Sequence, residues 1–381
     1  MIQLPAVGLT AAALLVSALV ALITTPVVRS LAFRVGAVDV PKDTRRMHNH
    51  PIPRMGGLAI FFGFILSVLI LLPLTTELRG ILLGSVVIVI LGIFDDIYAL
   101  PALPKFFVQI GAALVAVLHG NCIEFLSNPN IFSADPFWEL GWLSVPITVL
   151  WIVGITNAVN LIDGLDGLAC GVSTISSMTL MVIALIVSEP DVALLTAALA
   201  GACIGFLPYN LNPAKIFMGD TGSTFLGFIL AVVSIQGLFK FYTIISFAVP
   251  FLMLGLPIFD TCFAILRRVS HGQSPMKPDR GHIHHRLIDM GFSQKQAVAV
   301  LYIISAILGL SAVVLTTIGV VRAMLFLLAL CVAGGVAGKL YLDHNGMEPK
   351  SGGGRTRADP PHRTQIAGSE NFFGEEDRSE K

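Results

Sequence analysis

The sequence predicts an all-α integral membrane protein that crosses the bilayer about eleven times. Of its 381 residues, 55% are hydrophobic and only 13% are charged, whereas soluble domains carry roughly 25% charged residues. The hydrophobic residues gather in runs close to the length that a helix needs to cross the hydrocarbon core. A large soluble helical protein is the alternative, but its helices would not be apolar on every face.

Eleven apolar segments are candidate membrane helices. We predict the first to be a retained helix rather than a signal peptide, because it is long enough to span, lacks a basic start and is followed by Arg29 and Arg34. The segments lie near residues 6–28, 55–74, 78–94, 104–120, 141–158, 168–188, 191–208, 220–237, 240–259, 297–317 and 320–342.

The distribution of Lys and Arg predicts the orientation. If the N-terminus lies outside, 21 of the 24 Lys and Arg fall on the inner side, and only Arg79, Lys240 and Arg322 fall outside. Cytoplasmic loops are enriched in these residues, so the C-terminus is expected in the cytoplasm. We divide the chain into a membrane domain, 1–342, and a polar tail, 343–381, which cannot bury a core and is expected to be a disordered cytoplasmic tail.

Composition also excludes some partners and sites. The formal net charge is zero, which gives a nucleic-acid partner no global electrostatic support. None of the five cysteines forms a CxxC pair, so we expect neither a disulfide framework nor a cysteine zinc site.

Five polar clusters end the apolar segments, and the predicted topology places all five on the cytoplasmic side. Carboxylates near hydrocarbon are expensive and usually mark a functional site. Several on one face indicate a divalent cation and phosphates, so the chain is predicted to be a membrane enzyme. The clusters are Asp95-Asp96, the run Asn157 to Asp166, Gly219-Asp220, the basic stretch Arg267 to Arg280, and His282-x-His284-His285.

The acidic clusters are candidates for acid–base chemistry and metal binding. Asp95 and Asp96 end the third segment, and adjacent acids stay ionised only near a cation or a lysine such as Lys105. A solvated helix end is the alternative. Asp220 is a candidate metal ligand, or simply a helix N-cap.

The run at the end of the fifth segment repeats a polar group every third residue. Residues three apart share a helix face, and amides with carboxylates suit Mg²⁺ and its water shell. A capping array is the alternative. The four residues are Asn157, Asn160, Asp163 and Asp166.

The basic and histidine clusters are candidate phosphate contacts. Arginines bind diphosphates through charge-assisted hydrogen bonds, although Arg45 and Arg54 are also explained by the positive-inside rule. Gly56-Gly57 would permit close backbone approach. We expect the histidines to donate to phosphate rather than to bind zinc, because no cysteine accompanies them and Mg²⁺ prefers oxygen ligands. The candidates are Arg267, Arg268, Arg280, His282, His284 and His285.

Over roughly residues 38–300, these motifs in this order resemble the polyprenyl-phosphate N-acetylhexosamine-1-phosphate transferases of glycosyltransferase family 4. The segment Asp279-Arg-Gly-His-Ile-His-His-Arg-Leu287 is similar to the UDP-GlcNAc-using bacterial enzymes of teichoic acid, O-antigen and related glycan synthesis. It differs from the Pro-x-His-His-His-Phe-Glu pattern of the peptidoglycan-precursor enzymes.

The resemblance implies transfer of a sugar-1-phosphate from a UDP-N-acetylhexosamine to undecaprenyl phosphate, with release of UMP. It implies Mg²⁺, with Mn²⁺ as the alternative cation, and a site on the cytoplasmic face of a bacterial plasma membrane. It leaves a homodimer open. By position, Asp220 matches the metal-ligating aspartate, with Asp163 as the second candidate ligand. Asp95 matches the residue that deprotonates or orients the lipid phosphate. The remaining matches are a polar shell of Asp96, Asn160 and Asp163, a phosphate-binding Lys105, and the essential His284 and His285.

Two other functions stay open. A phospho-N-acetylmuramoyl-pentapeptide transferase of peptidoglycan synthesis is the closest alternative within the enzyme class. A secondary transporter is the alternative from another class, but such proteins carry ion sites at the bilayer midplane and internal repeats. Here the ionisable residues lie at helix ends, and no repeat is visible.

Overall fold

The computed structural model describes residues 4–40, 51–127, 137–239, 245–273 and 281–318, with 325–326 and 328–329. Within these ranges the chain is mostly helical. The α-helices are α1 (Leu4–Val35), α2 (Gly57–Leu71), α3 (Thr76–Tyr98), α4 (Ala102–Leu118), α5 (Ser144–Leu161), α6 (Leu168–Ile186), α7 (Pro190–Asn210), α8 (Gly219–Ser234), α9 (Ile245–Met253), α10 (Gly255–Ser270), α11 (Ile283–Asp289) and α12 (Gln294–Ile318).

The helices confirm a multi-pass membrane protein of the all-α class. Six helices in the described ranges are long and apolar enough to cross a membrane: α1, α3, α5, α6, α7 and α12. Each of the first ten predicted segments overlaps at least one helix, although residues 240–244 of the ninth lie outside the described residues. The eleventh, 320–342, lies almost wholly outside the described residues, and the tail 343–381 lies entirely outside them. Eleven crossings and the orientation therefore stay predictions.

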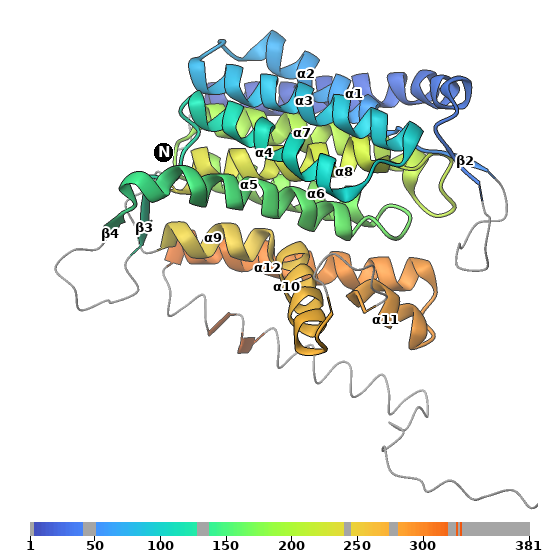
Figure 1. Cartoon of the computed structure of the whole chain (residues 1–381). Helices are drawn as coiled ribbons and strands as arrows, with labels where there is room; N and C mark the ends of the chain where they lie inside the picture. Colours follow the sequence, from blue (N-terminus) through green and yellow to red (C-terminus); the bar gives the residue numbers. More distant parts are fainter. Residues whose placement is uncertain are drawn as a thin grey trace, which may run out of the picture. The chain divides into compact units, whose positions relative to one another are not determined.

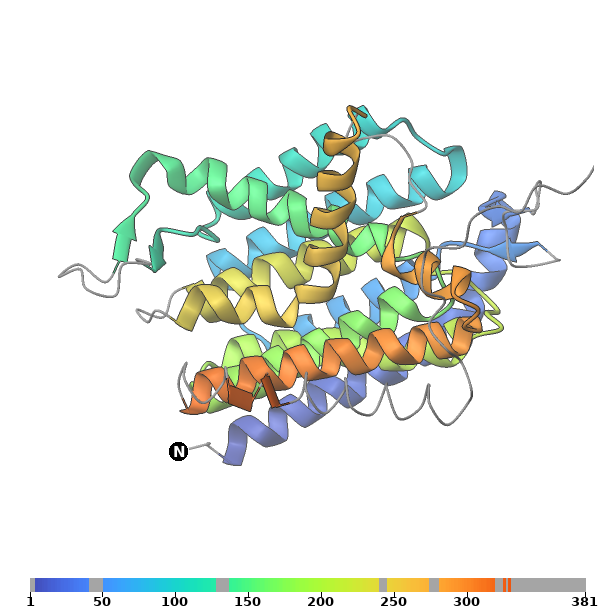
Figure 2. The ribbon, with the colours of Figure 1, turned by 90° about the horizontal axis from the view of Figure 1, so that it is seen from below.

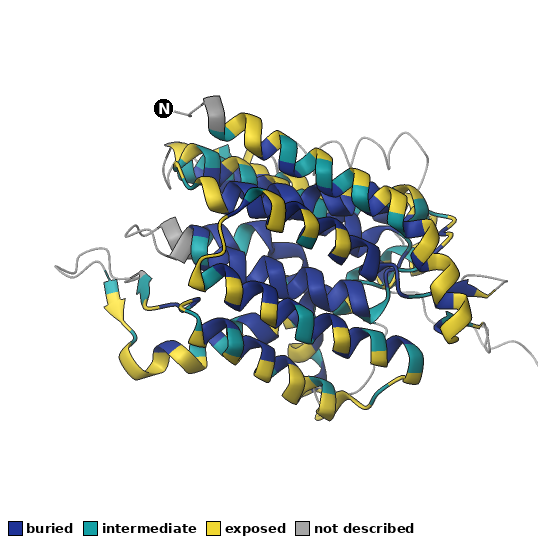
Figure 3. Cartoon of the chain, turned by 90° about the horizontal axis from the view of Figure 1, so that it is seen from above, coloured by how far each residue is buried: buried dark blue, intermediate teal, exposed yellow. Residues whose placement is uncertain are grey.

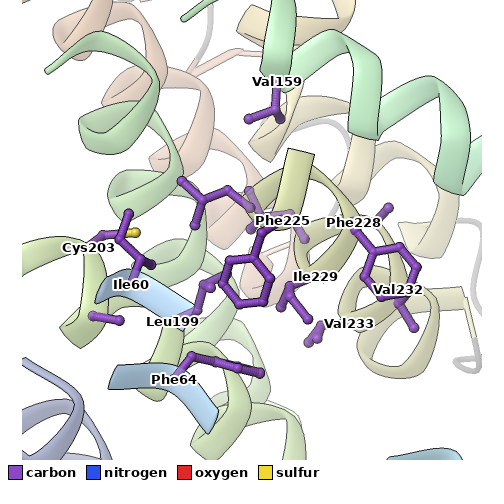
Figure 4. Packing of buried hydrophobic residues seen from close by; sticks show 14 of the residues in the cluster. Ile60, Phe64, Val159, Leu199, Cys203, Phe225, Phe228, Ile229, Val232 and Val233 are labelled. Atoms are coloured by element: carbon purple, nitrogen blue, oxygen red, sulfur yellow. The ribbon is translucent and has the colours of Figure 1, made fainter. Parts of the chain in front are cut away.

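The middle of the bundle is built around α8. Residues Thr221–Ser234 of this helix are all buried, and α8 packs against α2, α3 and α5. The Phe225 ring meets the rings of Phe61 and Phe64 edge-on, with centroids 5.5 and 5.6 Å apart, and lies within a cluster of aliphatic side chains (Figure 4). Figure 3 shows buried residues on the central helices and exposed ones on the outer faces. Because α8 is held on several sides, its N-terminal turn has a fixed position.

Small residues let α1 and α7 approach closely. A Cβ atom added at Gly201 or Gly205 would overlap the backbone of α1 at Leu14 or Ala18. Membrane helices commonly pack through such small residues, because hydrocarbon provides no hydrophobic drive for helix association. The two glycines therefore hold the first helix against the rest of the bundle.

Two short antiparallel pairs of strands, which the sequence analysis does not predict, lie at opposite ends of the bundle. Strand β1 (Val38–Asp39) pairs with β2 (Ile52–Pro53), and β3 (Phe125–Ser127) pairs with β4 (Phe137–Glu139). Figure 1 shows β2 and α11 at one end, away from β3 and β4. We call the end with β2 and α11 the site end.

The start of α2 lies directly against the start of α8. The backbone N–H of Phe217 donates to Pro53 over 2.8 Å, and that of Gly56 donates to Phe217 over 2.9 Å. A Cβ at Gly57 would overlap the backbone of Gly222. The close backbone approach predicted for Gly56-Gly57 is confirmed.

The predicted ninth segment, 240–259, is not one continuous helix. Helix α9 ends at Met253, and α10 begins at Gly255 after the non-helical Leu254. Pro257 lacks a backbone N–H, which disturbs a helix least in the first turn, and it lies in the first turn of α10. Figures 1 and 2 show α10 crossing the direction of its neighbours. It buries Asp260, Ala264 and Arg268, one turn apart, and exposes the large apolar side chains Phe259, Phe263 and Leu266.

Candidate active site

Lys105 joins two of the predicted acidic clusters. Its Nζ lies 2.8 Å from Asp95 Oδ2 and 3.0 Å from Asp220 Oδ2. Asp95 comes from the last turn of α3, Lys105 from the first turn of α4, and Asp220 from the first turn of α8. Asp95 Oδ1 also accepts from the backbone N–H of Leu100 over 2.7 Å, which closes the turn between α3 and α4. The structure thus brings together groups that are up to 125 residues apart in sequence.

Asp96 holds the N-terminus of α8. Its Oδ1 accepts from the backbone N–H of Asp220 over 3.0 Å, and its Oδ2 accepts from the backbone N–H and the hydroxyl of Thr221 over 3.1 and 2.6 Å. A carboxylate is favoured there, because the first N–H groups of a helix lack partners within the helix. Gly219, with φ +72°, leaves the room that this carboxylate fills. Asp96 provides this cap, whereas the Asp220 carboxylate faces Lys105.

The run at the end of α5 adds Asn160 and Asp163 to this cluster. The Asn160 side chain hydrogen-bonds the Asp220 carboxylate. Asp163 lies in the connection between α5 and α6 and is half-buried. Burial raises the pKa of its carboxyl to about 8, and the charges of Asp220, Asp96 and Asp166 add to the shift. These four carboxylates therefore share one electrostatic environment.

Asn157 and Asp166, both predicted to bind substrate, make contacts with other parts of the protein. Asn157 Nδ2 donates to Gln109 Oε1 on α4 over 2.6 Å. Asp166 Oδ2 accepts from Asn212 Nδ2 over 2.9 Å and from the backbone N–H of Ala214 over 3.0 Å. Asp166 thus links the α5–α6 connection to the α7–α8 connection. Their roles towards substrate stay predictions.

The histidine cluster lies against the same run. A Cβ added at Gly164, next to Asp163, would overlap Nε2 of His284. The ring of His284 stacks on that of His282, with centroids 5.8 Å apart and 11° between planes, and lies 4.3 Å from that of His285. Burial and the nearby His285 lower the pKa of His284 to about 4. His284 is therefore a neutral imidazole at neutral pH.

The predicted arginines occupy different places. Arg54 donates from Nε to the backbone carbonyl of Asp96 over 3.1 Å, so it lies at the acidic cluster. Arg267 donates from Nη1 to the carbonyl of Gly281 over 2.9 Å, next to the histidines. Arg268 is buried on α10. Arg45 and Arg280 lie outside the described residues.

Three residues at the site were missed by the sequence analysis. Thr221 bonds to Asp96, Gln109 bonds to Asn157, and Asp260 bonds to His282 over 2.8 Å. Asp260 had a detectable signal, because it is a lone carboxylate at the end of an apolar segment. Gln109 and Thr221 had none, because single polar residues on helices are common.

The donor set at the site end fits a hard cation that also binds substrate. Among the described residues, no three His, Cys, Asp or Glu side chains converge closely enough to hold a metal ion by themselves. Mg²⁺ is usually held by one or two carboxylates together with substrate phosphates and water. Asp220 provides a carboxylate of this kind, and Asn160 provides an amide oxygen. Asp163 would provide a second carboxylate, because the charge of a bound cation would oppose the burial that raises its pKa.

This arrangement combines cations, carboxylates and imidazoles at the ends of apolar helices, as a phosphoryl transfer between lipid and water would require. Residues 78–238 match glycosyl transferase family 4. Over 304 residues the chain is 47% identical to a Bacillus subtilis (strain 168) protein named probable undecaprenyl-phosphate N-acetylglucosaminyl 1-phosphate transferase, covering 80% of this chain and 84% of that protein.

Two further relatives are less similar. The chain is 36% identical to the decaprenyl-phosphate N-acetylglucosaminephosphotransferase of Mycolicibacterium smegmatis, over 79% of each protein. It is 30% identical to a phospho-N-acetylmuramoyl-pentapeptide-transferase of Staphylococcus aureus (strain MW2), over 68% of this chain and 83% of that protein. The chain therefore belongs to glycosyl transferase family 4, among its polyprenyl-phosphate N-acetylhexosamine-1-phosphate transferases.

Proposed function

We propose that the enzyme transfers N-acetylglucosamine-1-phosphate from UDP-GlcNAc to undecaprenyl phosphate and releases UMP. The observation that carries the proposal is Lys105, whose ammonium lies between Asp95 and Asp220 where three helices end. The Bacillus subtilis relative, named for undecaprenyl phosphate and N-acetylglucosaminyl 1-phosphate, supports the same substrates. Such a reaction would be the first membrane step of a cell-envelope glycan pathway.

The physical properties of the two substrates require a site at a membrane surface. A polyprenyl phosphate cannot leave the bilayer, and a nucleotide sugar cannot enter it. The clusters of the site end meet these conditions, because they lie at the ends of apolar helices. The positive-inside distribution of Lys and Arg supports the cytoplasmic face.

The chemistry needs charge control more than a strong base. The second pKa of a phosphate monoester is near 6, so the lipid phosphate is mostly ionised at neutral pH. Its oxygen attacks the β-phosphorus of the donor, and the bond between that phosphorus and the oxygen of the departing UMP breaks. We propose direct displacement, with Asp95 orienting the lipid phosphate and Lys105 neutralising phosphate charge.

We also propose that catalysis needs Mg²⁺, with Mn²⁺ as the alternative. Asp220 and Asp163 would hold the ion together with the donor diphosphate. When bound, it would neutralise charge on the diphosphate during transfer. Asn160, which contacts Asp220, would orient that carboxylate.

The donor sugar can be tested by competition. The Staphylococcus aureus relative is named for a pentapeptide substrate and is less similar than the Bacillus subtilis one. With purified enzyme and labelled UDP-GlcNAc, we expect unlabelled UDP-GlcNAc to compete and UDP-MurNAc-pentapeptide not to compete. Transfer from labelled UDP-MurNAc-pentapeptide, with none from UDP-GlcNAc, would favour the peptidoglycan enzyme.

A further inference from the structure

Asp260 is a buried carboxylate that the proposed chemistry does not use. Only 3% of its surface is exposed, and it lies on the inner face of α10. An ionised group in such a place is costly unless hydrogen bonds satisfy its lone pairs. Asp260 lies on a helix that crosses the direction of its neighbours (Figure 2), so its hydrogen-bond partners show which other part of the protein α10 holds in place.

Both oxygens of Asp260 are used at the start of α11. Oδ2 lies 2.8 Å from His282 Nδ1, and Oδ1 accepts from the backbone N–H of Ile283 over 2.8 Å. An ionised carboxylate only accepts hydrogen bonds, so His282 carries a proton on Nδ1. Asp260 thereby fixes the tautomer and the ring orientation of His282 and leaves its Nε2 for another contact.

The contact continues from His282 to the acidic cluster. His284 stacks on the His282 ring, and its Nε2 lies against Gly164, which follows Asp163. His282 and His284 expose only 5% and 3% of their surface. The surrounding atoms therefore hold both rings in these orientations. The buried carboxylate of Asp260 therefore contacts the loop that carries Asp163 through the stacked rings of His282 and His284.

We propose that Asp260 is a positioning residue for the transfer reaction, acting through His282 to hold the histidine stack against the Asp163–Gly164 connection. The proposal rests on the function proposed above. Asp260 itself touches no reacting atom. Its effect is on where the imidazoles meet the phosphates of the nucleotide sugar, and small misplacements of such groups cost up to about 100-fold in rate.

The competing explanation is that Asp260 only caps the N-terminus of α11. The Asp260→Asn variant distinguishes this structural role from the proposed positioning role. The amide oxygen can still accept from the Ile283 N–H, while the amide NH₂ then faces His282 Nδ1 and requires that nitrogen to be unprotonated. The cap is kept, but the tautomer of His282 is reversed. If the amide turns the other way, the cap is lost, and the thermal unfolding midpoint falls.

The test is a double-mutant cycle on the full chain in lipid or detergent, with UDP-GlcNAc as the donor. It compares wild type, Asp260→Asn, His282→Gln and the double variant, with Tm measured for each. Asp260→Glu replaces Asp260→Asn in a parallel cycle, so misfolding of one variant does not stop the test. Asp289→Asn is the matched control, because Asp289 is an exposed aspartate at the other end of α11.

We expect Asp260→Asn to lower kcat/KM about 10- to 100-fold, with a raised KM for UDP-GlcNAc and a Tm near that of the control. We expect the double variant to be no worse than the poorer single variant, because the two residues act as a unit. The proposal is overturned if Asp260→Asn is as active as Asp289→Asn, or if the losses of kcat/KM in the two single variants multiply in the double variant. It is also overturned if kcat and Tm both fall while KM for UDP-GlcNAc is unchanged. If wild type transfers from no UDP-sugar, the proposed function itself fails.

Discussion

The hydroxyl of Thr221 donates to the carboxylate of Asp96 over 2.6 Å, and this bond fixes where α8 begins. With the two backbone N–H groups that also bond to Asp96, it places Asp220 beside Lys105. Asp96 and Asp220 therefore have separable tasks. The first holds the N-terminus of α8, and the second pairs with Lys105.

Asp96→Asn is expected to weaken the fold as well as the activity. An amide presents only one oxygen, so its NH₂ would face a backbone N–H of α8, and one bond of the cap would be lost. Loss of such a buried bond costs about 1–3 kcal/mol. We expect a lower Tm and lower transfer by the Asn variant. An unchanged Tm would contradict the capping role.

Asp220→Asn is expected to abolish turnover without loss of folded protein. The Asp220 side chain is 31% exposed, and an amide oxygen can still accept from Lys105, so the fold should be kept while the negative charge is lost. Size-exclusion profile and Tm should match wild type, while transfer from UDP-GlcNAc disappears. Near-normal activity would contradict its role as a metal ligand.

Lys105→Met should lower kcat/KM by about 100-fold or more, the loss seen when one preorganised charge is removed from an active site. Lys105→Arg keeps the charge, but the planar guanidinium cannot occupy the same point between Asp95 and Asp220. We expect the kcat/KM of Lys105→Arg to lie between those of wild type and Lys105→Met. Steady-state kinetics with varied UDP-GlcNAc measure both variants, and wild-type values for Lys105→Met would contradict the proposal.

Gly164→Ala tests the contact between the histidines and the Asp163 connection. The new methyl would overlap the His284 ring and displace it, whereas a methyl at Gly154 on α5 meets nothing within 4 Å. We expect Gly164→Ala to lose most of its activity and Gly154→Ala to keep it. Equal activity of the two alanine variants would show that His284 does not need its observed position.

The buried His284 predicts a pH dependence of stability. Its pKa is about 4 in the folded protein and 6.5 ordinarily. Between these values the unfolded chain binds a proton that the folded chain does not, so the free energy of unfolding falls as pH falls, by about 3 kcal/mol in total. Between pH 7 and pH 4.5, the Tm of wild type should therefore fall further than the Tm of His284→Gln. Parallel losses would contradict a neutral, buried His284.

The sequence predicted the features that depend on local composition. Runs of apolar residues located the helices, and the three-residue spacing from Asn157 to Asp166 located one wall of the site, because both patterns are set by neighbours in the chain. The positions of Asp95, Lys105 and Asp220 at helix ends were equally visible.

Features set by tertiary contact were not predicted. The bond between Asp96 and Thr221 joins residues 125 positions apart, and no local pattern distinguishes a cap on a distant helix from a catalytic acid. The break between α9 and α10 was missed because both halves are apolar enough to read as one segment. Asp260, which directly follows that segment, was not predicted as a site residue, because its partner His282 follows 22 residues later.

The most direct test of the central claim is transfer of labelled sugar-1-phosphate from UDP-GlcNAc to undecaprenyl phosphate by the purified protein, with and without Mg²⁺. We predict a labelled lipid product and stoichiometric UMP, both lost when the metal is chelated and restored when it is added back. Absence of transfer from UDP-GlcNAc and from every other UDP-sugar, by folded protein with Mg²⁺ present, would contradict the proposed function.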